Sequence, residues 1–368
     1  MRFKTAVVAL LVMAVAILGL LWWRSYTADD GVSVYYLAAD SKDITQLFQF
    51  DLADETTHQM TASQEPVTGF AVSPNGEHLA FTTSLAAAEL GEETIWLMRN
   101  GRTPQPLLTC TDAACHHLVW APDGRRLIYE RRALDENGIP TLPRIWWLDT
   151  VNGDTVPVLE EDTYAAAPRL SPDGAWIAYV SPADEGVWLY HFADGRSHFI
   201  ASVTGTPVAW NPDSQSLLYS ALNPVALPAT ADEHSEEEHS HANTATHLFL
   251  FDLTSGRSRQ LSADVVIEDS APTWSSDGAW IAFGRRQVRT GSARQLWLMR
   301  ADGSDAHPLS ADPAWNVGPP NWSGDGRFLL FQRFNLNDPQ AEPGIWLLEI
   351  ATGNLRELVS PGFLPAWQ

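Results

Sequence analysis

The sequence predicts an all-β fold, a seven-bladed β-propeller of four-stranded antiparallel blades, and two repeated patterns support this prediction. The first pattern is a strand in which an aromatic residue follows an aliphatic one, shortly before a tight turn. It occurs seven times, and its aromatic members lie 48, 50, 42, 61, 48 and 49 residues apart: Phe48, Trp96, Trp146, Trp188, Phe249, Trp297 and Trp346. A unit of about 50 residues that recurs without interruption is typical of propeller blades.

The second pattern lies about half a unit earlier and consists of an aromatic or apolar residue, a small residue, proline, Asp or Asn, and glycine. Copies begin at Val72, Trp120, Leu170, Trp210, Trp274 and Trp322, and a seventh begins at Trp367. Proline fixes φ where a strand stops, and the Asp-Gly or Asn-Gly pair supplies the positive φ of a two-residue hairpin turn. Because a short apolar stretch follows each copy, we interpret the pattern as the first two strands of a blade.

The aromatic strand is then the third strand, and glycine turns such as Asn100-Gly101 and Asp302-Gly303 follow it. Beyond these turns lie candidate fourth strands, for example Ser258 to Leu261 and Leu355 to Leu358. No stretch after the N-terminus has a convincing helical periodicity. The part of the chain after the N-terminus is therefore predicted to be all-β.

The two ends of the repeat region are predicted to share one blade. The segment from Ser33 to about Ala62 contains only the last three strands of a unit, and Leu364 to Trp367 supplies the missing first strand. Joining N- and C-terminal strands in one sheet removes open edges and keeps the ring closed.

The tryptophans fit the repeat as core residues. Of the 16 in the chain, 14 follow the N-terminal segment and 12 of those stand in register on the repeats. Large aromatic side chains there can fill the wedge between neighbouring blades. Trp147 and Trp315 fall off the pattern, and Trp315 lies on a connection between blades, 312–320, which makes it the candidate for an exposed binding aromatic.

Residues 1–28 are predicted to form a signal anchor and a short linker. Ala6 to Trp23 is an uninterrupted apolar run of 18 residues, preceded by Arg2 and Lys4. As a helix it would be about 27 Å long, close to the thickness of the hydrocarbon core. A cleaved signal peptide is the alternative, but the single Ala-x-Ala sequence lies inside the apolar run. We favour an uncleaved transmembrane segment.

The positive residues before this segment place its start in the cytoplasm, and the propeller, 29–368, on the extracytoplasmic side of the inner or cytoplasmic membrane. With 45 acidic and 23 basic residues, the formal net charge is -22. This charge repels polyanions, so we expect no nucleic-acid partner.

The two cysteines, Cys110 and Cys115, are predicted to lie in the loop between the first two complete blades. In an oxidising compartment such a pair favours a disulfide. The adjoining His116 and His117 allow a metal site as the alternative, although the spacing is not a standard zinc spacing.

The longest spacing marks an acidic, histidine-rich insertion at 223–247. Its candidate zinc ligands are His234, His239, His241 and His247, because imidazoles among carboxylates suit Zn²⁺. A polar, acidic segment without aromatic residues is more often a solvated loop. Apart from this possible zinc, no cofactor is expected.

The repeats resemble the TolB-type (WD40-like) propeller repeat, in which an aromatic residue, Ser, Pro, Asp and Gly precede an apolar strand. The similarity covers nearly all of 33–368 and is best at Leu170 to Tyr179, with departures at Asn75, Ser214, Ser276 and Gly324. It implies a propeller that binds proteins or small ligands, commonly in the periplasm. TolB has an additional α/β domain before its propeller, so its specific role in the Tol system does not carry over.

The repeats also resemble the propellers of prolyl oligopeptidase-type peptidases and of oligogalacturonate lyase. The peptidases need a hydrolase domain with a Gly-x-Ser-x-Gly elbow, which we do not expect, because the sequence ends where the ring closes. The lyase acts on an acidic sugar polymer, a substrate that the net charge of -22 disfavours.

We therefore predict a membrane-anchored, extracytoplasmic propeller that binds a protein partner or serves in assembly, with no catalytic residues assigned. The alternative is a propeller enzyme, a lyase or hydrolase acting on a carbohydrate or cell-wall substrate at the channel mouth. The fold hosts both kinds of function. Histidine, arginine and carboxylate side chains that converge at one end of the channel would favour the enzyme.

Overall fold

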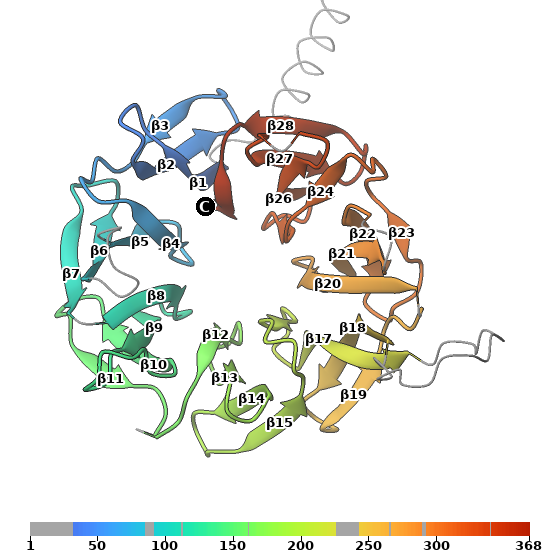
Figure 1. Ribbon diagram of the computed structural model, residues 1–368, viewed down its shortest axis with the longest axis horizontal. Helices are drawn as coiled ribbons and strands as arrows, with labels where there is room; N and C mark the ends of the chain where they lie inside the picture. The colour runs from blue at the N-terminus through green and yellow to red at the C-terminus, as the bar shows by residue number, and fades with distance from the viewer. Residues whose placement is uncertain are drawn as a thin grey trace, which may run out of the picture.

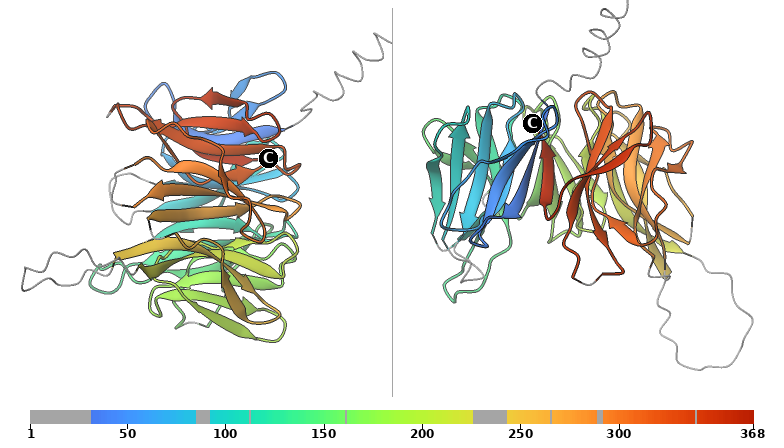
Figure 2. Two further views of the ribbon diagram at one scale, coloured as in Figure 1. Left: turned by 90° about the vertical axis from the view of Figure 1, so that its right-hand side faces the viewer. Right: turned by 90° about the horizontal axis from the view of Figure 1, so that it is seen from above.

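The computed structural model describes residues 32–84, 92–111, 113–160, 162–225, 243–264, 266–288, 292–338 and 340–368. These residues form seven antiparallel sheets arranged as a ring around a central channel (Figure 1). Figure 2 shows the ring from the side, with the strands of neighbouring sheets standing next to one another. The predicted seven-bladed propeller is confirmed.

Blades 1 to 3 follow one another along the chain, each with its strands paired in sequence order. Blade 1 contains β4 (Val67–Val72), β5 (His78–Ser84), β6 (Glu93–Arg99) and β7 (Gln105–Cys110). Blade 2 contains β8 (Ala113–Trp120), β9 (Arg126–Ala133), β10 (Arg144–Asp149) and β11 (Thr155–Pro157). Blade 3 contains β12 (Ala166–Leu170), β13 (Trp176–Ser181), β14 (Gly186–His191) and β15 (Ser197–Ala201).

Blades 4 to 6 repeat this arrangement, and blade 6 has its first strand in two pieces. Blade 4 contains β16 (Ala209–Trp210), β17 (Ser216–Val225), β18 (Asn243–Asp252) and β19 (Arg257–Gln260). Blade 5 contains β20 (Ile267–Trp274), β21 (Trp280–Gln287), β22 (Gln295–Arg300) and β23 (His307–Pro308). Blade 6 contains β24 (Trp315–Val317), β25 (Asn321–Trp322), β26 (Phe328–Asn335), β27 (Gly344–Glu349) and β28 (Leu355–Val359).

The closing blade joins both ends of the chain, as the sequence predicts. It consists of β29 (Phe363–Trp367), β1 (Ser33–Ala39), β2 (Thr45–Asp51) and β3 (Thr57–Gln59), in that order. β29 pairs antiparallel with β1, so that Trp367 lies opposite Val34. The pairing covers the inner edge of β1 and leaves the ring closed.

The hairpin turns between first and second strands show why the repeat needs its polar residues. In blade 3, the Ser171 hydroxyl donates to Asp173 Oδ1 at 2.5 Å and accepts the Trp176 backbone N–H at 3.0 Å. Gly174 completes the turn with φ at 71°. In blade 4, Ser214 stands where the repeat has glycine and still adopts a φ of 61°. The departures from the repeat therefore preserve the turn.

Tryptophans of the first strands tie five of the seven blades to the blade before them. The indole N–H of Trp210 donates to the carbonyl of Arg169 at 3.0 Å. Four further junctions carry the equivalent bond, at 3.0 to 3.3 Å: Trp120 to Ala71, Trp274 to Ala209, Trp322 to Thr273 and Trp367 to Asn321. The aromatic member of the repeat thus supplies both apolar area and one hydrogen bond to the ring.

The other two junctions have an aliphatic residue in place of this tryptophan, Val72 or Leu170. A groove lies at each of these two junctions. The groove between the closing blade and blade 1 reaches from Tyr35 to Met98, and the groove between blades 2 and 3 is lined by Leu170 itself. An aliphatic side chain fills less of the wedge between two sheets than an indole does.

Two predicted segments differ from expectation or lie outside the described residues. β17 and β18 remain paired as far as Val225 and Asn243, so both strands extend into the predicted insertion, 223–247. The described residues contain no helix with the length and apolar character to cross a membrane. The predicted anchor at 1–28 lies outside them.

Candidate functional site

The central channel contains a cavity with a volume of about 1230 Å³. The first strands of blades 1 to 6 or the segments beside them line it, and proline, alanine and tryptophan side chains make up much of its wall. Small-molecule pockets have volumes of about 300–1,000 Å³, so the channel can hold something larger than a typical cofactor.

A recurring bulge shapes the channel wall. Three residues before the aromatic position of the repeat, the backbone turns left-handed, with φ between 48° and 53° at His117, Ala167, Ala271 and Leu364. In each case the register between the first and second strands shifts. Bulges redirect side chains and end regular pairing, and they are frequent beside functional sites.

Of the described residues that line the channel, three are ionisable: Arg169, Glu268 and Arg294. Glu268 accepts from Arg286 at 2.9 Å and lies 3.4 Å from Arg294. Burial and the repulsion of Arg286 lower the pKa of Arg294, against the attraction of Glu268. Glu268, Arg286 and Arg294 thus form one group of charges in blade 5.

Arg169 differs because no carboxylate among the described residues pairs with it. Its Nη1 donates at 2.9 Å to the carbonyl of Pro168, and burial lowers the pKa of the guanidinium. A guanidinium has five N–H donors. Most of the donors of this half-buried cation are therefore available to an acceptor that enters the channel.

Among the described residues of the channel wall, the side chains that would favour an enzyme are present only in part, as two arginines and one carboxylate. No histidine occurs among the described residues that line the channel, and its carboxylate Glu268 is already paired with arginines. The wall offers apolar contacts, backbone groups and one unpaired cation. The described part of the wall holds no histidine–carboxylate pair.

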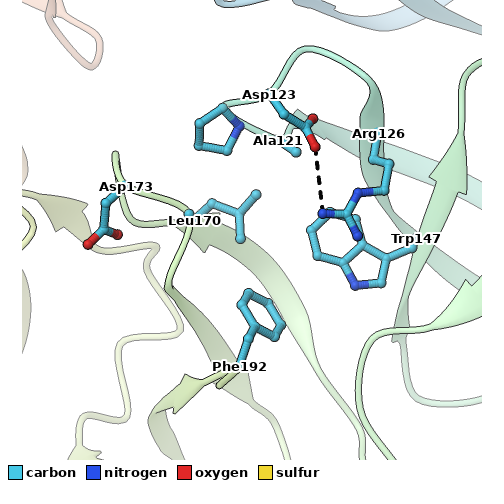
Figure 3. Close-up of a pocket in the computed structure, with 9 residues that line it drawn as sticks. Ala121, Asp123, Arg126, Trp147, Leu170, Asp173 and Phe192 are labelled. Carbon is cyan, nitrogen blue, oxygen red and sulfur yellow. Dashed lines mark ion pairs between the residues drawn. The ribbon is translucent and has the colours of Figure 1, made fainter. Parts of the chain in front are cut away.

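The groove between blades 2 and 3 is a smaller candidate, with a volume of about 330 Å³ (Figure 3). The Arg126 guanidinium lies 4.5 Å from the centre of the Trp147 ring and 3.6 Å from Asp123. Trp147 also packs against Phe192, with ring centres 5.8 Å apart. Because arginine covers one face of its indole, Trp147 has a structural partner despite its place off the repeat.

The predicted binding aromatic, Trp315, lies half-buried at the start of β24. Arg333 stacks between Trp315 and Trp346, with its guanidinium carbon 4.7 Å and 4.9 Å from the two ring centres. The two indoles contact each other edge to face at 5.5 Å. These contacts fix Trp315 in blade 6, and its role in binding stays a prediction.

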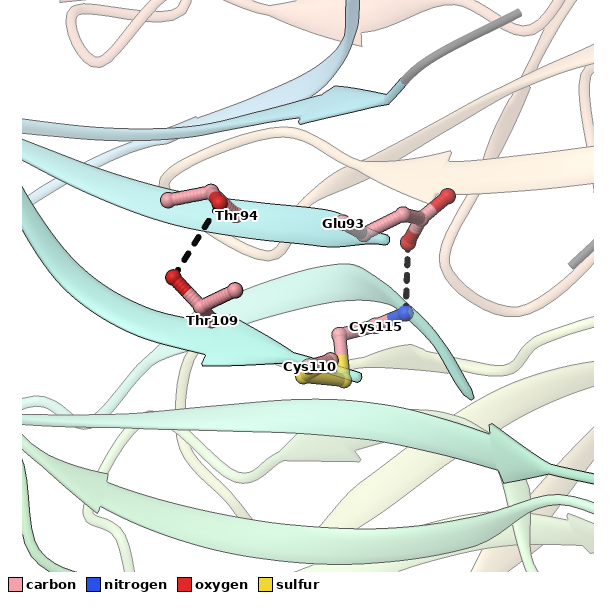
Figure 4. Close-up of a disulfide and its surroundings, with 5 residues drawn as sticks. All are labelled: Glu93, Thr94, Thr109, Cys110 and Cys115. Atoms are coloured by element: carbon pink, nitrogen blue, oxygen red, sulfur yellow. Dashed lines mark hydrogen bonds between the residues drawn. A yellow bond between two sulfur atoms is a disulfide. The ribbon is translucent and has the colours of Figure 1, made fainter. Parts of the chain in front are cut away.

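Cys110 and Cys115 form a disulfide between the end of β7 and the third residue of β8 (Figure 4). Both cysteines lie in strands, whereas the sequence suggested a loop. The Cys115 backbone N–H also donates to the Glu93 carboxylate of β6. Blades 1 and 2 are thus joined by a covalent bond and a hydrogen bond.

Directly after this disulfide, His116, His117 and Glu130 form a cluster that could hold a metal ion, with the three ligand atoms within 4.8 Å of one another. His117 Nδ1 lies 2.9 Å from Glu130 Oε2, and His116 Nε2 lies 3.4 Å from Oε1. Burial raises the pKa of Glu130, but hydrogen bonds from His116, His117 and the Ala167 N–H outweigh it and lower the pKa to about 2. The hydrogen bond to Glu130 raises the pKa of His116.

The candidate zinc ligands of the insertion are only partly placed. His234, His239 and His241 lie outside the described residues. His247 lies within β18, opposite Ala221, where its side chain is buried and its Nε2 is 2.9 Å from the carbonyl oxygen of Asp264. Zinc binding by this set stays a prediction.

Comparisons with known proteins agree with the fold. The sequence matches no protein-family profile. It is 22% identical over 197 residues to the uncharacterized peptidase YuxL of Bacillus subtilis (strain 168), a match that covers 47% of this chain and 30% of that protein. The chain thus matches less than a third of the relative's length.

Two solved structures are similar over most of the chain. The β-propeller domain of the Trilobed protease from Pyrococcus furiosus, which has an open velcro topology, matches with a TM-score of 0.61 and 12% identity, covering 90% of this chain and 92% of that one. TolB from Acinetobacter baumannii matches with a TM-score of 0.51 and 14% identity, covering 94% and 69%. The chain therefore has a TolB-like β-propeller fold, which peptidase propellers share.

Proposed function

We propose that this chain is a protein-binding module, held by residues 1–28 on the extracytoplasmic side of a membrane, and that its central channel receives an extended segment of the partner. The observation that carries the proposal is the channel wall, which combines a volume of about 1230 Å³ with a half-buried cation, Arg169, that has no carboxylate partner among the described residues. A pocket for one small substrate would need less room and more converging polar groups.

An extended peptide suits this wall for two reasons. Its apolar side chains can pack against the prolines and tryptophans of the first strands, such as Pro172, Pro272 and Trp274. A carboxylate on the peptide, from a side chain or a chain end, can pair with Arg169, because arginine binds carboxylates through two parallel hydrogen bonds. The TolB-like fold supports a binding role, although a fold by itself does not determine function.

Capture of the partner tests the channel. We expect the tagged full-length protein, solubilised from membranes in detergent, to retain a partner that Arg169→Gln loses. Arg196→Gln is the matched control, because Arg196 is a solvent-exposed arginine in the turn between β14 and β15 that pairs with Asp194. Equal capture by the wild type and both variants would contradict a role for the channel.

The topology is tested independently. Alkaline phosphatase fused after Gln368 is active only outside the cytoplasm, so we expect an active fusion, and we expect carbonate washing to leave the protein in the membrane. An inactive fusion would reverse the orientation. A mature N-terminus beyond Ala28 would show cleavage in place of anchoring.

A further inference from the structure

We infer that His116, His117 and Glu130 form a binding site for a divalent transition-metal ion of the zinc class, at the junction of blades 2 and 3. This site is separate from the channel and from the histidine-rich insertion. Its donor set is two imidazole nitrogens and one carboxylate oxygen, the same set that holds zinc with an open position in several zinc enzymes.

The bulge in β8 is what brings the two histidines together. Successive side chains of a regular strand point to opposite faces of the sheet, so neighbouring histidines would normally diverge. His117 has a φ of 53°, and the register with β9 shifts between His116 and Val119. Both imidazoles consequently face the same carboxylate, that of Glu130, which pairs with His116 across the two strands.

The carboxylate is held in place before any ion arrives. Glu130 is 5% exposed, and its Oε2 accepts the backbone N–H of Ala167 at 3.0 Å. Ala167 is itself the left-handed bulge residue of the next blade. Outer contacts of this kind orient a ligand and strengthen metal binding.

The histidines provide access to the site. The His116 and His117 side chains are 35% and 56% exposed, so an ion can enter from solvent and keep water in its remaining positions. The facing charges are mixed: the buried Glu93 carboxylate favours a cation, whereas Arg132 opposes it. The disulfide occupies both cysteines and fixes β8 beside the site.

Metal binding at His117 Nδ1 requires a change of tautomer. His117 Nδ1 lies 2.9 Å from an ionised oxygen of Glu130, which requires a proton between the two atoms. When the ion binds, Nδ1 gives up this proton to solvent and offers its lone pair, while Nε2 takes up a proton from solvent, so that the ring stays neutral. Histidine and carboxylate favour zinc-like ions, whereas Ca²⁺ and Mg²⁺ require mostly oxygen ligands.

The test uses full-length protein in detergent, freed of metal by a chelator, and ZnCl₂ as the probe in titration calorimetry. The starting protein carries His234→Ala, His239→Ala and His241→Ala, so that the insertion does not contribute heat. We expect it to bind one equivalent of Zn²⁺, and we expect His117→Asn and Glu130→Gln each to weaken this binding by on the order of 100-fold. CaCl₂ should give no such binding.

His307→Asn is the matched control, since His307 is a part-exposed histidine beside the single carboxylate of Asp305. His117→Asn keeps the test valid even if Glu130→Gln misfolds, because asparagine tolerates the left-handed backbone and the side chain is mostly exposed. Visible absorption of bound Co²⁺ is the second measurement and should disappear in His117→Asn. No Zn²⁺ binding by the starting protein, or equal binding in all variants, would overturn the proposal.

Discussion

The indole N–H of Trp367 donates to the backbone carbonyl of Asn321 at 3.0 Å, and this bond joins the closing blade to blade 6. Trp367 belongs to the last strand of the chain, whereas β1, its partner in the sheet, is the first. The same contact between a first-strand tryptophan and the preceding blade recurs at four other junctions. The closing blade is therefore joined to blade 6 by the same kind of indole-to-carbonyl hydrogen bond that joins the blades at those four junctions.

Removing one of these bonds inside the ring should cost measurable stability. Trp274 is 7% exposed and donates to the Ala209 carbonyl at 3.2 Å. Trp274→Phe keeps most of the apolar area but leaves this carbonyl without its donor, so we expect a loss of about 1–3 kcal/mol in the free energy of unfolding. Chemical denaturation followed by fluorescence measures it.

Trp280→Phe is the control for that measurement. The Trp280 ring lies under Arg300, at 4.6 Å, and its indole N–H has no hydrogen bond with another described residue. We expect this variant to lose less than about 1 kcal/mol, the value of an exposed cation–π contact. If both variants lose the same stability, the inter-blade hydrogen bond does not contribute.

Deleting Gly362 to Gln368 should destabilise the whole ring. The deletion removes β29, opens the inner edge of β1 and takes away the packing of Phe363 and Trp367. Two half-buried aromatic side chains are worth on the order of 5 kcal/mol by their buried area, so we expect a clearly lower melting temperature. Trp367→Phe retains the strand, so its melting temperature should lie between those of the wild type and the deletion. Equal melting temperatures for the deletion and the wild type would contradict closure.

A buried ion pair in blade 5 provides a third prediction. Asp269 is fully buried and accepts from Arg285 at 2.7 Å and 2.8 Å, and the guanidinium stacks 4.4 Å from the centre of the Trp297 ring. Asp269→Leu leaves a largely buried cation without its counter-charge, so we expect a loss of about 3–5 kcal/mol. The measurement is again the midpoint of chemical unfolding.

The double variant Asp269→Leu, Arg285→Met separates the charge from the packing. Replacing both partners of a buried pair by apolar residues is often neutral or stabilising, so we expect recovery of most of the loss. Asp194→Asn, at a pair that is exposed on both sides, should change little. A double variant as unstable as Asp269→Leu alone would show that the pair matters for its shape more than for its charge.

The fold could be predicted from the sequence because most blades contain the same short sequence patterns. The Ser-Pro-Asp-Gly turn, the aromatic third strand and the split closing blade are all short-range patterns, and the strand ends differ from expectation by only one or two residues in most cases. The insertion is the exception: β17 and β18 continue to Val225 and from Asn243, because backbone pairing tolerates a sequence without apolar alternation.

The candidate sites were harder to predict because they depend on register. Glu130 reaches His116 only through the pairing of β9 with β8, and His117 joins them only because a bulge reverses its direction. Arg169 stands among apolar residues, and no pattern in the sequence marks it as unpaired. One usable signal existed: proline directly follows the left-handed residue in three first strands, at Pro168, Pro272 and Pro365.

The last prediction concerns acid stability, which the aspartates of the hairpin turns should influence. Burial raises the pKa of Asp173, but hydrogen bonds from Ser171, the Ala175 N–H and Ser214 outweigh it, so the pKa lies below its usual 3.8. The Ser275 hydroxyl and the Ala279 N–H likewise lower the pKa of Asp277. Carboxyls that bind protons less tightly in the folded state stabilise it above the unfolded pKa, and this contribution is lost as the pH falls through the folded-state value.

Blade 1 already contains the neutral form of this turn. Asn75 replaces the aspartate and still accepts from the Ser73 hydroxyl at 2.7 Å. We therefore expect Asp173→Asn, Asp277→Asn to fold, to melt somewhat below the wild type at pH 7, and to lose this deficit as the pH falls below the unfolded pKa of about 4 and through the lowered folded-state pKa. Melting temperatures at several pH values give the curve.

Asp123→Asn is the control, because Ala121 stands in place of the serine in its turn and leaves Asp123 without that hydroxyl donor. Its melting curve should follow the wild type more closely at every pH. A deficit in the double variant that stays constant as the pH falls below the unfolded pKa and through the folded-state pKa would mean that the turn aspartates act through their shape alone. The serine hydroxyl would then contribute no preference for the charged form, and the aspartate of the repeat would be interchangeable with asparagine in every blade.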